Sequence, residues 1–298
     1  MHFFHKIKWT ETHWATFFIL PCLLGLLVFT YLPILGSLGL SFSYWNLLGT
    51  PKFVGFLNYQ TVFNDPLFWQ SLLTTVFFVL MTALLEVSLG LALAVWLNGI
   101  VRFQSFFQAT YFLPYITPMV SVALVWGWVY DPANGVLNWL LKQLQIIDAP
   151  VAWLYNEKTA LWAVIVLGLW KSVGYTMIIF LTSLQSVPGA LEEAGKLDGA
   201  GAIQQFFLII LPSISPTVFF VSTMVLIQGF QVFDSVYLLT QGGPAHHTEL
   251  LVYWMFKNAF EFYKVGEASA IAYILFLLIF AITLVQWIVR KKWVLHED

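Results

Sequence analysis

Charge is scarce in this chain. Asp, Glu, Lys and Arg together make up only 9% of its 298 residues, whereas a soluble domain carries about 25%. Hydrophobic residues reach 60%, and the mean hydropathy is +0.81. A soluble fold cannot hide so much apolar surface, so much of it must face lipid. The formal net charge of −2 also argues against a nucleic-acid partner.

Cysteine and catalytic motifs are equally scarce. The single cysteine, Cys22, excludes an intramolecular disulfide, and its apolar surroundings predict a packed thiol. No Gly-rich phosphate loop ends in Lys-Ser or Lys-Thr, so we expect no ATP hydrolysis by this chain. His246 and His247 have no acidic neighbour at metal-ligand spacing, which predicts solvated side chains and no metal site. We assign no catalytic residue.

Long apolar runs dominate what is present. Crossing a bilayer takes about 20 residues, and a backbone in lipid must be helical. Six runs are long enough: Trp14–Leu35, Phe68–Leu97, Phe106–Tyr130, Leu161–Leu184, Pro216–Tyr237 and Ala268–Val289. The first is too long for a signal-peptide core, so we expect it to be retained. The fold class is therefore an all-α integral membrane protein with six transmembrane helices.

Lys and Arg set the orientation. With a cytoplasmic N-terminus, the inner segments hold Lys6, Lys8, Arg102, Lys196, Arg290, Lys291 and Lys292. Cytoplasmic segments carry the excess of Lys and Arg, and the last three directly follow the final run. We therefore expect residues 1–13 and 290–298 to be cytoplasmic, flanking a six-span domain over 14–289. The polar segment 188–216 between the fourth and fifth spans then also lies inside.

That polar segment predicts two short helices joined by a turn. Ala190–Leu197 contains good helix formers. Asp198-Gly199 is a turn pair in which Gly accepts a positive φ and Asp can cap the next helix. Ala200–Ile210 resumes as a helix, and prolines at 212 and 216 should stop it and redirect the chain. Residue chemistry alone leaves two interpretations open: a docking element for a partner, or an amphipathic helix that anchors the loop.

The segment resembles the EAA loop of ATP-binding-cassette importer permeases of type I. That loop reads Glu-Ala-Ala, two residues, Asp-Gly-Ala, five residues, Phe, two residues, Ile, one residue, Leu-Pro, three residues, Pro. The matching residues here are Glu193, Ala194, Asp198, Gly199, Ala200, Phe206, Ile209, Leu211, Pro212 and Pro216, with Gly195 in place of the second Ala. The resemblance implies a coupling helix on the cytoplasmic face, formed by these residues together with Gly195.

The same resemblance implies the partners. They are a second permease subunit, normally a different chain, a pair of nucleotide-binding ATPases that hold ATP and Mg²⁺, and an external solute-binding protein. The setting would be the inner membrane of a prokaryote, and this chain would hold no cofactor of its own. Three further stretches resemble the carbohydrate branch of the family: Phe53–Tyr59 with Asp65–Trp69, Phe112–Tyr115, and Leu239–Pro244.

A sugar path needs aromatic rings and amides within the spans. The candidates are Tyr115, Trp170, Lys171, Tyr175, Gln228, Gln231 and Asp234. Tyr115, Trp170 and Tyr175 match aromatic positions of the maltose-type member. Its asparagines in the fifth span do not carry over, because Gly229 and Val232 stand there. For each aromatic residue the alternative is packing or an interface anchor.

Two charges fall within spans. Lys171 and Glu86 are costly in lipid, at about 2.5–3.5 kcal/mol for a central Lys, so both should face protein or water. Lys171 either binds an anionic substrate or pairs with Glu86 or Asp234. We favour the structural pair or an interfacial position over substrate binding.

The main hypothesis is the permease subunit of an importer for a sugar or sugar-like solute. The same machinery could instead carry an anionic glycerophospho-compound, an amino acid or a peptide. A secondary transporter or channel is the alternative from another class, but it would need ion-coordinating carboxylates within the spans.

Overall fold

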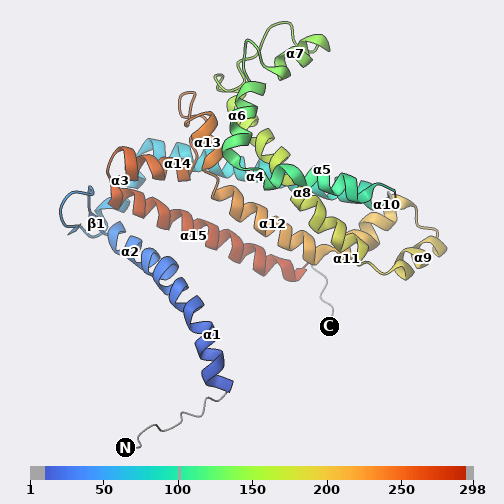
Figure 1. Cartoon of the computed structure of the whole chain (residues 1–298), viewed down its shortest axis with the longest axis horizontal. Helices are drawn as coiled ribbons and strands as arrows, with labels where there is room; N and C mark the ends of the chain where they lie inside the picture. Colours follow the sequence, from blue (N-terminus) through green and yellow to red (C-terminus); the bar gives the residue numbers. More distant parts are fainter. Residues whose placement is uncertain (1–10, 100–101, 293–298) are drawn as a thin grey trace, which may run out of the picture. The chain divides into compact units, whose positions relative to one another are not determined.

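The computed structural model describes residues 11–99 and 102–292, and most of them are helical (Figure 1). The expected cytoplasmic residues 1–10, including Lys6 and Lys8, and residues 293–298 lie outside the described residues. The helices are α1 (Glu11–Leu26), α2 (Leu32–Ser41), α3 (Leu57–Asn64), α4 (Pro66–Asn98), α5 (Gln104–Ile116), α6 (Met119–Val129), α7 (Val136–Gln143), α8 (Ala160–Gln185), α9 (Gly189–Leu197), α10 (Ala202–Gln205), α11 (Leu211–Ser213), α12 (Ser215–Phe230), α13 (Asp234–Leu239), α14 (Leu251–Phe256) and α15 (Val265–Val289). Single π-helical turns cover Leu27–Tyr31, Phe206–Ile210 and Lys257–Glu261, and a 3₁₀ turn covers Arg290–Lys292.

Four continuous helices are long and apolar enough to cross a membrane. They cover Trp14–Ser41, Pro66–Asn98, Ala160–Gln185 and Val265–Val289. Two further apolar helix pairs are sharply bent, so the number of spans reaches the expected six when each bent pair is taken as one. The fold class is thus an all-α membrane protein, as the apolar runs predict.

The third and fifth spans are not the single straight helices that we expected. The helix axis turns by 97° between α5 and α6, at Thr117-Pro118. Thr117 is extended (φ −72°, ψ 135°), because a residue before proline is pushed out of the α region. The fifth span ends at Phe230 instead of Tyr237, and α13 begins separately at Asp234.

The chain forms two compact units. The first contains described residues 11–64 and 257–273. In it, the short antiparallel strands β1 (Ser43–Tyr44) and β2 (Lys52–Phe53) pair Ser43 with Phe53. The Asn58 amide donates to the carbonyl oxygens of Ser41 at 2.8 Å and Ser43 at 2.9 Å. Gly266 lies so close that a Cβ there would be 2.1 Å from the Ser43 oxygen.

The prediction for Cys22 is wrong. Its thiol is exposed. Most of the described side chains of α1 are exposed as well, and the helix is apolar around its whole circumference. A helix that is apolar on every side is one that lipid or another apolar surface covers.

The second unit contains residues 65–256 and 274–292 of the described chain. Helix α8 packs against both α4 and α5. Glycines permit both approaches: a Cβ on Gly90 of α4 would lie 2.5 Å from the Thr176 methyl group, and one on Gly174 would lie 1.7 Å from the Tyr111 oxygen. The buried core between α4, α8 and α12 contains Ala94, Leu97, Met177, Phe180, Ile214 and Val221. These close crossings place α8 at the centre of the unit.

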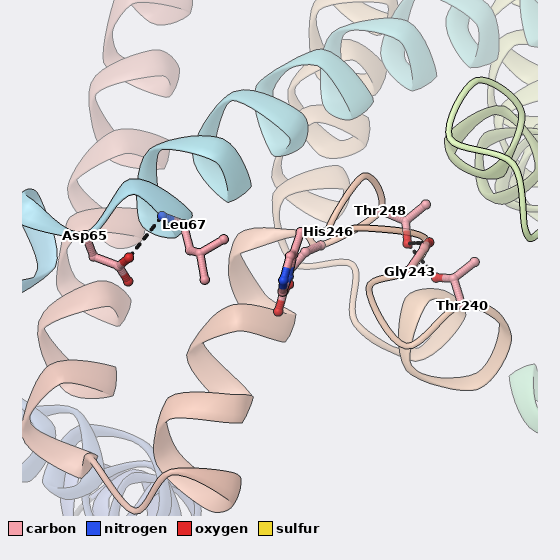
Figure 2. Close-up of polar contacts among 7 residues, drawn as sticks. Asp65, Leu67, Thr240, Gly243, His246 and Thr248 are labelled. Atoms are coloured by element: carbon pink, nitrogen blue, oxygen red, sulfur yellow. Dashed lines mark hydrogen bonds and ion pairs between the residues drawn. The ribbon is translucent and has the colours of Figure 1, made fainter.

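Short polar contacts fix the ends of its elements (Figure 2). Asp65 caps α4, because its carboxylate accepts from the Leu67 amide at 3.0 Å. The Thr248 hydroxyl lies 2.7 Å from the Gly243 oxygen and 2.8 Å from the Thr240 hydroxyl, closing the loop after α13.

The two loop histidines are not simply solvated, contrary to expectation. His246 contacts the Glu249 carboxylate three residues on. His247 pairs with Glu157 at 3.2 Å, from the segment between α7 and α8. The first pair is local and readable from the sequence. The second joins residues 90 positions apart, so only the fold could bring it together.

Candidate functional site

A cavity of about 320 Å³ lies among α4, α5, α8 and α12. It lies at the break between α5 and α6 and at the break between α12 and α13. Tyr115 and Met119 line it from either side of the Thr117-Pro118 break, and Gln231–Phe233 lines it between α12 and α13. Broken helices expose backbone groups, and in membrane proteins such backbone occurs where it faces protein or a cavity. This position makes the cavity the candidate substrate site.

Five of the seven sequence candidates line this cavity: Tyr115, Lys171, Gln228, Gln231 and Asp234. The last three recur every third residue across the end of α12. Gln228 lies in the last turn of α12, Gln231 is its C-cap, and Asp234 begins α13. The break between the two helices thus places two amides and a carboxylate at the cavity.

Trp170 and Tyr175 do not line the cavity formed by this chain. The Tyr175 ring stacks on Tyr115, with centroids 4.5 Å apart and planes 8° apart. Trp170 packs edge-on against Trp126, with centroids 5.5 Å apart. Tyr175 therefore supports a cavity residue from behind, and Trp170 lies on a different face of α8.

Lys171 has a role that we did not expect. Its ammonium donates to the carbonyl oxygens of Pro114 (3.2 Å), Tyr115 (3.1 Å) and Thr117 (2.6 Å). It forms no ion pair with Glu86 or Asp234 within the described ranges, so the expected ion pair is wrong. The last carbonyls of a helix have no partner within it, and the bend at Thr117 exposes them. A cation near a helix C-terminus also complements the helix dipole.

Glu86 and Thr82 are cavity residues absent from our list of candidates. Glu86 lines the cavity from α4, only 5% exposed, and accepts from the Thr176 hydroxyl at 2.7 Å. Thr82 lies one turn earlier on the same face, only 7% exposed. Their spacing of four residues on an apolar helix is the sequence signal that could have found them.

The expected docking segment forms a second candidate site. Helix α9 ends in a turn at Gly199, whose φ of +82° favours glycine. We expected Asp198 to cap the next helix, but it is the C-cap of α9. The N-cap of α10 is Gly201, whose amide donates to the Gln204 side chain at 3.1 Å.

The segment divides into an exposed face and a packed base. Glu193, Ala194, Asp198 and Gly199 are exposed. Gly195 is buried, and a Cβ there would lie 2.5 Å from the Ile209 Cδ1 atom. The exposed face also carries apolar side chains: Leu197 (89% exposed), Ile203 (77%) and Leu208 (74%). Uncovered apolar groups among polar neighbours are typical of a protein-binding surface.

The second helix of the segment is longer than expected. Pro212 does not stop it: Ala202–Ser213 continues through the π turn Phe206–Ile210, whose wider spacing absorbs the missing proline amide. The axis turns by 71° at Ile214, before Pro216. Phe206, Leu211 and Pro212 are partly buried, and Leu211 packs on the core between α4, α8 and α12. The exposed face is therefore attached to the same bundle that encloses the cavity.

Comparison with known proteins identifies the family. Residues 86–293 match the family described as "Binding-protein-dependent transport system inner membrane component". The chain belongs to this family. The matched region contains the cavity residues from Glu86 onward and the whole docking segment.

Individual relatives agree. The chain is 37% identical to the probable ABC transporter permease protein YurN of Bacillus subtilis, over 90% of this chain and 93% of that one. It is 32% identical to the trehalose/maltose transport system permease protein MalF of Thermococcus litoralis, covering 94% of each chain. Among solved structures it is similar to a bacterial ABC transporter that imports the acidic polysaccharide alginate. That match has a TM-score of 0.82 at 22% identity and covers 95% of this chain and 96% of the other, a likeness of fold.

Proposed function

We propose that this chain is the membrane-spanning permease subunit of an ATP-driven importer for a sugar. It works with a second permease subunit, a pair of ATPase subunits and an external binding protein in the inner membrane of a prokaryote. ATP is hydrolysed by the partners, and both termini lie in the cytoplasm. Family membership and the sugar-transporting relatives support this proposal, and the observation that carries it is the docking segment.

The geometry of that segment suits force transmission. An acidic and apolar face is exposed, while Leu211 holds the base against the bundle. An ATPase that grips this face would move the ends of α8 and α12, which carry Lys171 and Gln228 at the cavity. We assign coupling to Glu193, Ala194, Gly195, Asp198, Gly199, Ala200, Phe206, Leu211 and Pro212.

A substrate path follows from the cavity. Tyr115, Gln228, Gln231 and Asp234 offer a ring face, two amides and a carboxylate, which suit sugar rings and hydroxyls. Lys171 supports the path by holding the α5 end in place. Tyr175 supports Tyr115. Trp170 packs on Trp126 and is not among the described residues that line the cavity.

Glu193→Lys tests the coupling assignment. Its carboxylate is exposed, so charge reversal should leave folding intact and abolish ATP-dependent sugar uptake by the complete transporter in proteoliposomes. Glu192→Lys, which makes the same change one residue earlier on α9, is the control and should retain uptake. Normal uptake by a Glu193→Lys transporter present at wild-type levels would disprove the coupling role.

A further inference from the structure

Glu86 and Thr82 occupy one wall of the cavity and have unused polar atoms. The Thr82 hydroxyl is buried and makes no hydrogen bond to any part of the chain that the structure describes. A buried hydroxyl without a partner costs about 1–3 kcal/mol relative to a bonded one. Such an atom beside a substrate cavity is explained when the substrate supplies the partner.

The Glu86 carboxylate is also only half used. One oxygen, Oε1, accepts from Thr176 at 2.7 Å. Ser172 lies near enough to be a second donor, but its single hydroxyl proton already goes to the Gly168 oxygen at 2.9 Å. A carboxylate has about four acceptor positions. Glu86 therefore keeps acceptor capacity on the cavity side, one helical turn from the Thr82 hydroxyl.

The ionisable side chains that line the cavity disfavour an anionic ligand. Among its described lining residues, Lys171 is the single Lys or Arg, while Glu86 and Asp234 are both acidic. An ammonium has three protons, and those of Lys171 point to three backbone oxygens at 2.6–3.2 Å. No cation is left to receive a carboxylate or phosphate group. An anionic ligand would meet two acids and no free donor of opposite charge.

We infer that Thr82 and Glu86 form a hydroxyl-binding subsite and that the substrate is a neutral sugar. Vicinal hydroxyls of a sugar ring donate to the free Glu86 oxygen and accept from or donate to Thr82. Uronates and sugar phosphates are excluded because the described lining residues offer their negative charge no free cation. This inference rests on the proposed transport function and names its substrate class. It also separates this chain from the structurally similar alginate importer, whose substrate is acidic.

The test measures sugar binding to the purified complex of this chain with its partner permease and ATPase. The binding protein is omitted, because it would impose its own selectivity. The probes are a panel of neutral disaccharides and the matching panel with each 6-hydroxymethyl group oxidised to a carboxylate. A ligand that binds only the folded complex raises its unfolding temperature in proportion to occupancy, which gives an apparent Kd.

Neutral members should stabilise the complex saturably, and their oxidised counterparts should not. Thr82→Val should raise the apparent Kd roughly two- to twelve-fold, the loss of one neutral hydrogen bond. Thr223→Val is the matched control: it lies on α12 outside the cavity, its hydroxyl bonds Phe219, and its Kd should not change. Glu86→Gln keeps the shape and the contact with Thr176 but replaces the free acceptor oxygen by an amide that donates, so it should raise the apparent Kd of the neutral sugars.

Two results would overturn the subsite. One is equal stabilisation by neutral and oxidised sugars in the wild-type complex. The other is an unchanged Kd in Thr82→Val together with a higher unfolding temperature without sugar, which would mean that the hydroxyl is merely an unsatisfied group. Failure of the proposed function looks different: neither panel binds, and proteoliposomes of the complete transporter take up no sugar when ATP is supplied.

Discussion

The Lys171 ammonium donates to the Thr117 carbonyl oxygen at 2.6 Å, across 54 residues of sequence. It thereby closes the end of a helix that two prolines have opened, at Pro114 and Pro118. The helix break that shapes the cavity is thus stabilised by the Lys171 ammonium, which supplies donors to the exposed carbonyl oxygens. Hydrogen bonds to three backbone oxygens offset the free-energy cost of placing a lysine within a membrane span.

Lys171→Met should destabilise the complex by about 1–3 kcal/mol, because it removes the side-chain donor from the part-buried carbonyls of Tyr115 and Thr117. Thermal unfolding of the purified complex measures this loss. Lys171→Arg retains a cation with several donors and should recover most of the stability. An unchanged unfolding temperature in Lys171→Met would contradict the capping role.

Gly174→Ala should prevent normal accumulation of the protein. Its Cβ would lie 1.7 Å from the Tyr111 oxygen, and a backbone atom in a packed helix cannot move aside as a side chain can. Overpacking costs about 1–3 kcal/mol and sometimes more, and here the clash places the loss at the upper end. The measurement is the amount of folded protein in membranes. Gly168→Ala on the same helix is the control, because outside its own turn of α8 no atom of the described residues lies within 4 Å of the added Cβ.

Gly199→Ala should weaken coupling more than stability. The φ of +82° at this turn disfavours a side chain by about 1–2 kcal/mol, which shifts α9 relative to α10 or loosens the turn. We expect normal membrane levels with reduced uptake per ATP hydrolysed. Gly189→Ala, at an α-helical start with open space, should behave as wild type. Equal transport efficiency in both variants would show that the turn geometry is dispensable.

Gly195→Ala should be close to neutral in stability. Among the described residues, the added Cβ would clash with the Cδ1 atom of Ile209, the mobile end of a side chain, and would lie at ordinary contact distance, 3.6 Å, from the Gln205 Cγ atom. Replacing a helical Gly by Ala also gains about 0.5–1 kcal/mol. Ile209→Val removes that Cδ1 atom and should cost about 0.5–1.5 kcal/mol in the wild type, but less in the Gly195→Ala background. A double-mutant cycle of unfolding temperatures measures the difference; strict additivity would mean that the two residues do not interact.

Part of the site was readable from the sequence because it is local. Glu193 to Pro216 carries its own turn and helix signals, and the structure forms α9, the Gly199 turn and the following helix there. Gln228, Gln231 and Asp234 meet at the cavity although α12 ends at Phe230, so their common place depends on the helix break and not on helical spacing. The extent of the second helix was misjudged, since the π turn before Pro212 leaves no mark in composition.

The sequence by itself determined the solvent, the class of fold and the approximate spans. Lipid demands long apolar helices, and that requirement is written in consecutive residues. Only the tertiary structure decided what the polar residues within those spans do. Thr176 reaches Glu86 across 90 residues, and Lys171 reaches the broken end of α5 instead of a carboxylate. Such choices depend on which helices cross closely, here at Gly90 and Gly174. A helix that is apolar on every side shows no sequence pattern that predicts which neighbouring helix it will cross closely.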